Sequence, residues 1–195
     1  MYLKKNSIIY IIIIIFFFHK NVSADENIND KAINYLSKLK FFSAEFIQDD
    51  NETVSQGTLY IGEKRIRIEY NIPSKILIIL DENKAMYFNY DLEEDEFFNP
   101  QNTHASFFFE IFNNLEFFSD SIAISENSYL ILEKIGHNEL GKYSIKVFFE
   151  NNPLLIRKIE VISEEISLVL SIFNHSYNEN FGANFFKLIN PSFFK

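Results

Sequence analysis

The chain has 195 residues and carries 18 Lys and Arg against 27 Asp and Glu, a formal net charge of −9. A surface of this sign repels phosphate groups, so the composition argues against nucleic acid and anionic membrane surfaces as partners. The sequence contains no cysteine, which excludes disulfide bonds, thiol catalysis and the cysteine-linked lipid anchor of a lipoprotein.

The N-terminal residues have the pattern of a secretory signal peptide. Two lysines precede an almost unbroken apolar run over residues 8–18, and a small-residue motif ends at Ala24. This combination predicts a cleavable signal peptide over residues 1–24 and therefore an exported protein. The run is shorter than the roughly 20 residues of a membrane-spanning helix, so an uncleaved anchor is the disfavoured alternative. Residues 25–195 are then expected to form a single domain.

An amphipathic helix is predicted at the start of this domain, over residues 25–40. Four apolar side chains recur there at helical spacing on one face, and Asn29 or Asp30 is expected to cap the helix. The four apolar residues are Ile28, Ala32, Leu36 and Leu39.

The pattern then changes to a period of two, which predicts β-strands. Such alternation gives a continuous antiparallel sheet with one apolar and one wet face, and Pro73 interrupts its pairing. The acidic run at residues 91–96 lacks the ligand spacing of a calcium loop and is predicted to be a solvated edge strand or loop, without a metal. The strands predicted in this part are residues 42–48, 57–61, 65–70, 75–80 and 85–90.

Residues 105–112 predict a second, shorter helix. They are too apolar for a surface loop and poor in β-branched side chains, so we expect a helix with Thr103 as its cap, pressed against the apolar face of the sheet. Residues 115–118 extend this insertion. Many short strands with hairpin turns predict a sandwich or barrel. The later strands are predicted at residues 129–134, 143–150, 154–162, 166–173 and 185–189.

Signals of catalysis are weak. His104, His137 and His175 stand singly in polar segments, without the spacing of metal ligands on one element. There is no G-x-S-x-G nucleophile motif and, with five glycines, no glycine-rich phosphate loop. We therefore expect neither enzyme activity nor a cofactor. A Ser-His-Asp site assembled from distant segments is the remaining alternative.

Four short motifs carry a family resemblance. They are FSAEFIQ from Phe42, GTLYI from Gly57, RIEYNIP from Arg67 and YFNY from Tyr87. In this order, and with the strand pattern of the C-terminal half, they resemble the LolA family, the periplasmic carriers of outer-membrane lipoproteins in Gram-negative bacteria. The resemblance covers essentially the whole predicted domain.

The resemblance implies a mainly β fold with short helices. The family has an unclosed antiparallel β-barrel, or half-barrel, with a helical lid over its concave apolar face. The acyl chains of lipoproteins would bind between this sheet and a lid formed by residues 28–39 and 105–112. The expected cavity residues are Phe46, Leu59, Ile61, Ile66, Ile68, Tyr70, Phe107 and Phe108.

One family feature is missing from the sequence. Many members have an Arg-Pro pair shortly after the strand that begins here at Gly57, and its Arg helps to hold the lid. Residues 62–65 contain no Pro, so Lys64 or Arg65 is the expected latch. A solvated strand charge is the alternative interpretation of either side chain.

The resemblance also implies which partners the protein would have. A monomeric carrier would take acylated lipoproteins from an inner-membrane ABC transporter and deliver them to the outer membrane, through the receptor LolB where one exists. The missing cysteine favours the carrier over the receptor, because the receptor is itself lipid-anchored. The alternative function is a periplasmic lipid-binding sensor or regulatory module on the same half-barrel.

Overall fold

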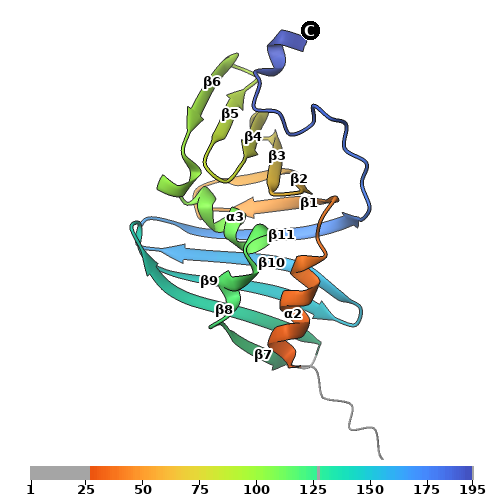
Figure 1. Cartoon of the computed structure of the whole chain (residues 1–195). Coiled ribbons are helices and arrows are strands. Elements are labelled where there is room, and N and C mark those ends of the chain that lie inside the picture. The colour runs from red at the N-terminus through yellow and green to blue at the C-terminus, as the bar shows by residue number, and fades with distance from the viewer. Residues whose placement is uncertain (1–26, 127, 195) are drawn as a thin grey trace, which may run out of the picture.

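The computed structural model describes residues 27–126 and 128–194, and the predicted signal peptide lies outside these residues. The described chain forms one eleven-stranded sheet, in which every neighbouring pair of strands is antiparallel, with helices α2 and α3 packed on one face (Figure 1). The strand order is β6-β5-β4-β3-β2-β1-β11-β10-β9-β8-β7. Because β6 and β7 form the two edges and do not pair with each other, the barrel is unclosed. The expected fold class is confirmed.

The strands follow the chain in order, and the helices stand at its start and between β6 and β7. The strands are β1 (Phe42–Asp49), β2 (Val54–Gly62), β3 (Arg65–Ile72), β4 (Ile76–Leu80), β5 (Ala85–Asn89), β6 (Glu94–Phe98), β7 (Ile122–Glu126), β8 (Tyr129–Asn138), β9 (Gly141–Asn151), β10 (Leu154–Ser163) and β11 (Ser167–Ser176). The helices are α2 (Ile28–Ser37), α3 (Ala105–Asn113) and the 3-10 turns η1 (Pro100–Asn102), η2 (Leu115–Phe118) and η3 (Pro191–Phe194).

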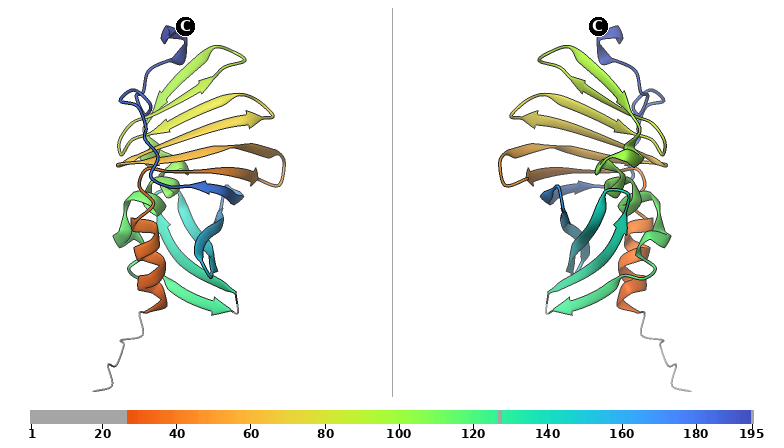
Figure 2. Two further views of the ribbon diagram at one scale, coloured as in Figure 1. Left: turned by 90° about the vertical axis from the view of Figure 1, so that its right-hand side faces the viewer. Right: turned by 90° about the vertical axis from the view of Figure 1, so that its left-hand side faces the viewer.

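The two faces of the sheet differ in what covers them. In β3, Ile66 and Ile68 are buried in the core that includes residues of both helices, whereas Arg65 and Arg67 alternate with them and point the other way. We call the first side the helix-covered face and the second the outer face. Figure 2 shows both helices on one side of the curved sheet. The predicted apolar face is therefore real, and it forms the main core.

Helix α2 begins later and ends sooner than the pattern suggested. The side chain of Asn27 caps it by accepting a hydrogen bond from the backbone N–H of Asn29 at 3.3 Å, so the predicted caps Asn29 and Asp30 were wrong. Ser37 is its last residue. The predicted apolar stripe still packs inward at Ala32 and Leu36.

Helix α3 confirms the predicted aromatic helix. Its buried residues include Phe107, Ile111 and Phe112, which join the core against the sheet. The hydroxyl of Thr103 accepts the backbone N–H of Ala105 at 3.3 Å, although His104 occupies the residue next to the helix and makes no side-chain capping bond. Thr103 thus caps the N-terminus of α3 from the residue before the N-cap position, which His104 occupies.

The C-terminal segment, residues 177–194, corrects the last strand prediction. Residues 185–189 form no strand, and β11 is the last strand of the sheet. Leu188 instead packs on the outer face against the buried cluster Leu77, Ile79, Met86 and Phe88. The apolar character that suggested a strand over residues 185–189 instead allows Leu188 to pack against the outer face of β4 and β5. The other late predictions correspond to β8–β11, and β7 was not delimited by the pattern.

The acidic run is a solvated edge, as expected. Residues 94–96 are exposed and belong to the edge strand β6. Among the described residues, no group of three or more His, Cys, Asp or Glu side chains could hold a metal ion.

Candidate functional site

A small, partly enclosed cavity lies on the helix-covered face, between the central strands and α3. Its volume is about 10 Å³, which is no more than one water-sized probe occupies. The side chains around it come from β1, β2, β3, β11 and α3. They are Phe46, Gln48, Leu59, Ile68, Tyr70, Phe108 and Leu170.

The polar end of this cavity is made by Tyr70 and Gln48. The Tyr70 hydroxyl donates a hydrogen bond to Gln48 Oε1 at 2.8 Å, and its ring meets that of Phe46 edge to face with centroids 5.2 Å apart. Burial, and secondarily the negative charge of Asp50, raise the pKa of Tyr70 to about 12. Tyr70 is therefore a neutral hydrogen-bonding group at any physiological pH.

Phe108 closes the cavity from the helical side. It is partly exposed and packs against the core from α3. The polar side chains of this helix bond locally: Ser106 Oγ donates to Thr103 O at 2.9 Å, and Asn113 Nδ2 donates to Phe109 O at 3.3 Å. Beyond the contact of His104 at its N-terminal end with Ser163 of β10, apolar packing holds α3 on the sheet. An apolar ligand can replace such packing.

Helix α2 is held differently, by polar bonds to the other half of the sheet. The Tyr35 hydroxyl accepts the backbone N–H of Ile156 at 3.1 Å and shares a hydrogen bond with the Tyr177 hydroxyl at 3.1 Å. Lys31 Nζ donates to Asn151 Oδ1 at 2.7 Å. These bonds tie α2 to β9, to β10 and to the residue that follows β11. At its N-terminal end α3 has the contact of His104 Nε2 with Ser163 Oγ of β10, at 3.2 Å.

The structure brings together five of the eight predicted cavity residues. Ile61, Ile66 and Phe107 lie in the same core but do not line the cavity, and each is at most 2% exposed. Sequence reasoning missed Gln48 and Leu170. Leu170 follows the alternation of β11 and could have been found, whereas Gln48 is polar and escaped a search for apolar residues. The five that line the cavity are Phe46, Leu59, Ile68, Tyr70 and Phe108.

The predicted latch residues do not face the lid. Lys64 is exposed in the turn between β2 and β3, with a positive φ of 52°. Arg65 lies on the outer face, where it pairs with Asp81 at 3.2 Å and donates to the carbonyl of Phe186 at 3.4 Å. Because Arg65 alternates with Ile66, it cannot reach the helices from its position in β3. These contacts do not support the latch assignment.

Arg67, two residues further along β3, fixes the C-terminal segment to the outer face. Its Nη1 donates to the carbonyl of Phe185 at 2.7 Å, and its guanidinium lies 4.5 Å from the centre of the Phe185 ring. Glu69 pairs with the same guanidinium at 2.5 Å. Both strand arginines thus hold the C-terminal segment.

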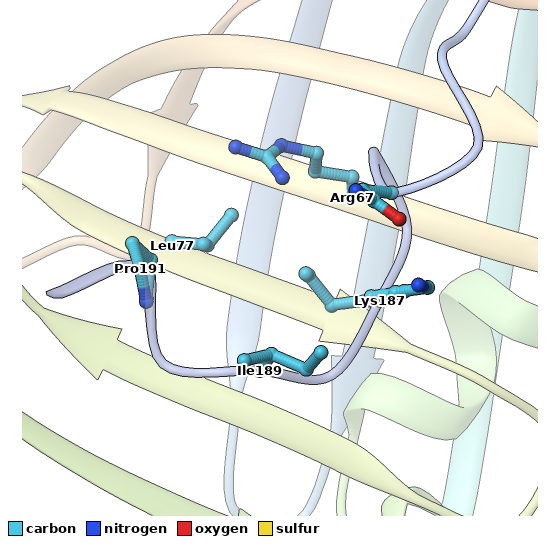
Figure 3. A pocket seen from close by; sticks show the side chains of 7 residues that line it. Arg67, Leu77, Lys187, Ile189 and Pro191 are labelled. Atoms are coloured by element: carbon cyan, nitrogen blue, oxygen red, sulfur yellow. The ribbon is translucent and has the colours of Figure 1, made fainter. Parts of the chain in front are cut away.

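A larger recess, of about 300 Å³, lies on the outer face beneath this segment. Figure 3 shows Lys187, Ile189 and Pro191 of the segment around it, opposite Arg67 and Leu77. Its apolar floor is already covered, since Leu77 and Ile79 are each only 1% exposed. Arg67, Asn184 and Lys187 also line the recess, whereas the lining of the smaller cavity is mainly apolar. We therefore place the candidate site on the helix-covered face.

One group of side chains has the residue types of a hydrolase triad without its geometry. His104 Nε2 lies 3.2 Å from Ser163 Oγ and 3.9 Å from Glu165. A triad needs the acid at the other ring nitrogen, where it orients the imidazole. Here both partners share one nitrogen, so this trio is not arranged for acyl transfer.

An open β half-barrel with short helices across its apolar face defines a class, the periplasmic binding modules of the LolA type. The chain belongs to the LolA family, since the family model "Outer membrane lipoprotein carrier protein LolA" matches residues 37–188. Members of this family are periplasmic carriers. No helix in the described part of the chain has the length and apolar character needed to cross a membrane.

Individual relatives are distant. The uncharacterized protein RP864 of Rickettsia prowazekii (strain Madrid E) is 24% identical over 165 residues, which are 83% of this chain and 76% of that protein. Among solved structures, MucB aligns with a TM-score of 0.50 at 8% identity, over 85% of this chain and 63% of MucB. An uncharacterized conserved protein from Thermus thermophilus aligns with a TM-score of 0.49 at 8% identity, over 80% of this chain and 91% of that one. The MucB likeness shows the fold alone.

Proposed function

We propose that this protein is a periplasmic carrier that binds the acyl chains of lipoproteins between its sheet and helices and ferries them from the inner to the outer membrane. The observation that carries the proposal is the small, mainly apolar cavity beneath Phe108, built from four strands and helix α3. Membership of the LolA family supports it. The proposed partners are acylated lipoproteins, an inner-membrane ABC transporter and, where present, the receptor LolB.

The cavity volume implies that binding requires opening. About 10 Å³ has no room for an acyl chain, so Phe108 and α3 must move away from β3 before a chain can enter. Each buried CH₂ contributes about 0.8 kcal/mol, and three long chains would nominally exceed about 30 kcal/mol, beyond the roughly 18 to 21 kcal/mol at which affinities saturate. The free energy of lifting α3 offsets part of this gain, which leaves a complex that can release its cargo without ATP.

Replacing Ile68 with Glu tests the proposed binding face. Ile68 lines the cavity and is 8% exposed, so a carboxylate there would have to be desolvated next to the acyl chains. We expect about a tenfold or larger loss of affinity for a purified triacylated lipoprotein. Circular dichroism and thermal unfolding would establish that the variant is folded.

A matched control is available in the adjacent part of the sheet. Ile47→Glu places the same charge on the outer face of β1, where the side chain is already 38% exposed. It should bind the lipoprotein as the unmodified protein does. Equal binding by folded Ile68→Glu and Ile47→Glu variants would refute the placement of the acyl site.

A periplasmic lipid-binding sensor or regulatory module is the second candidate. The similarity in fold to MucB favours its consideration. The two candidates differ in ligand: a carrier binds a whole lipoprotein through its acyl chains, whereas a sensor of this kind binds lipid without carrying a protein.

A further inference from the structure

One polar contact joins the N-terminal end of α3 to the sheet. His104 directly precedes the helix, and its Nε2 lies 3.2 Å from Oγ of Ser163, the last residue of β10. The side chains of Ser106, Asn113 and Asn114 bond inside the helical insertion instead. Within the residues that the structure describes, His104 therefore supplies the polar link between this helix and a strand.

The Ser163 hydroxyl is held in place by the turn that joins β10 to β11. Its Oγ accepts the backbone N–H of Glu165 at 3.3 Å and that of Ile166 at 3.2 Å. The backbone N–H of Ser163 donates in turn to the carbonyl of Ile166 at 2.8 Å, which closes the turn. The position of this oxygen is thus set by the sheet and does not depend on α3.

The same bonds determine the direction of the contact with His104. A serine hydroxyl has one proton to donate and two lone pairs that accept. The two backbone N–H groups of the turn occupy the lone pairs, so the proton of the Ser163 hydroxyl is left for the imidazole. The hydroxyl therefore donates to Nε2, and the imidazole carries its own proton on Nδ1.

The contact is placed where it opposes opening of the cavity. His104 already has helical backbone angles, with φ −64° and ψ −11°, and Phe108 follows it by four residues, about one helical turn. Side chains four residues apart project on the same side of a helix. A movement that lifts Phe108 away from the cavity would therefore also draw His104 away from Ser163.

We propose, resting on the acyl-binding function above, that His104 and Ser163 form a clasp that holds α3 closed over the empty cavity and breaks when an acyl chain lifts the helix. His104 is a positioning residue in this account, because it is not among the residues that line the cavity. The clasp adds to the free energy of opening, so it weakens acyl binding, and its re-formation favours release. Glu165 adds little to the clasp, since its side chain is 72% exposed and lies 3.9 Å from Nε2.

Hydrogen exchange of backbone amides in the ligand-free protein tests the clasp itself. His104→Ala should speed exchange of the α3 amides about threefold or more and leave those of α2 unchanged. His104→Gln should restore the slow exchange, because its side-chain carbonyl reaches about as far as Nε2 and accepts the same hydroxyl. Glu165→Gln is the matched control: it removes the charge beside the imidazole, keeps the bonds of Ser163, and should leave the exchange of α3 unaltered.

Affinity for a purified triacylated lipoprotein tests the effect of the clasp on binding. His104→Ala and Ser163→Ala should each bind about two- to fivefold more tightly than the unmodified protein. The double variant should bind no more tightly than the tighter of the two, because both substitutions remove one bond. A separate effect of the turn at Ser163 would instead multiply with the effect of His104→Ala.

The outcomes distinguish the clasp from the function beneath it. Unchanged α3 exchange in His104→Ala, equal exchange in His104→Gln and His104→Ala, or weaker lipoprotein binding by His104→Ala would each refute the clasp, and acyl binding would stand. Multiplied effects in the double variant would refute it as well. If α3 exchange responds as expected but neither the unmodified protein nor any variant binds the lipoprotein, the acyl-binding function fails, and the control of binding by the clasp fails with it.

Discussion

At the scale of single residues, Gly57 allows the β2 backbone to sit between β3 and Phe46. A Cβ atom at this position would lie 2.1 Å from the carbonyl oxygen of Glu69 and 2.8 Å from the Phe46 ring. Neither neighbour can withdraw easily, since one is backbone in β3 and the other belongs to the core. The glycine therefore permits the close strand approach beside the candidate cavity.

Gly57→Ala should destabilise the protein by about 1–3 kcal/mol, the range for overpacking a well-filled site. The measurement is the free energy of unfolding in urea. Gly182→Ala is the matched control, because a Cβ there meets nothing within 4 Å. Equal stability of the two variants would mean that β2 and β3 are less closely packed than described.

Some of the residues of the candidate site could be predicted from the sequence and others could not. Alternation identified Phe46, Leu59 and Ile68 because burial on one sheet face follows the period of a strand. It could not find Gln48, since a polar residue at an inward position looks like a break in the pattern. It could not assign Arg65 either, because the role of an outward charge depends on which segment covers the outer face.

At the scale of elements, α3 and α2 differ in attachment and so in expected motion. Tyr35 and Lys31 tie the middle of α2 to the sheet through hydrogen bonds, whereas α3 rests on the sheet through aromatic packing, with a polar contact to the sheet from His104 at its N-terminal end. Local unfolding and opening favour elements with fewer fixed bonds. We therefore assign the opening movement to α3.

Phe108→Ala tests α3 as the lid. The smaller side chain enlarges the cavity and removes the ring that a ligand must displace, so acyl ligands should bind about two- to fivefold more tightly. Stability should fall by about 1–2 kcal/mol, below the range for a fully buried Phe because the ring is partly exposed. Competition binding and thermal unfolding measure the two effects.

The control for this variant is Phe117→Ala. Phe117 is another partly exposed aromatic of the helical insertion, but it stacks on Tyr143 and does not line the cavity. It should leave ligand affinity unchanged. Weaker acyl binding by Phe108→Ala would contradict the lid assignment, since it would make Phe108 a binding contact and not an obstacle.

The C-terminal segment shows that the apolar pattern of a segment does not determine whether it joins the sheet as a strand. Residues 185–189 have the composition of a strand, and the edge strands β6 and β7 would each have a side free for pairing. Such a segment can either pair with an edge strand or pack across a face of the sheet. Which of the two occurs depends on which apolar surface the rest of the fold leaves exposed. Here the outer cluster around Leu77 and Phe88 is the open surface, and Leu188 covers it. The two helices were predictable because their apolar stripes have helical spacing in any context.

At the scale of the whole molecule, the sheet carries two apolar clusters with different covers. The helix-covered face holds the larger core and the small cavity, while the outer face of β4 and β5 is covered by the C-terminal segment. The alternation of strands predicted one continuous antiparallel sheet. Its failure to close, with β6 and β7 as separate edges, depends on strand register and twist, which the pattern does not contain.

The most direct test of the carrier function is native mass spectrometry of the protein purified from a Gram-negative periplasm after co-expression with a lipoprotein. We predict a one-to-one complex that disappears when the acylated cysteine of the cargo is replaced. Free phospholipid bound in its place would contradict the carrier function and favour a lipid sensor. A well-folded protein with nothing bound would mean that the helix-covered face is closed core.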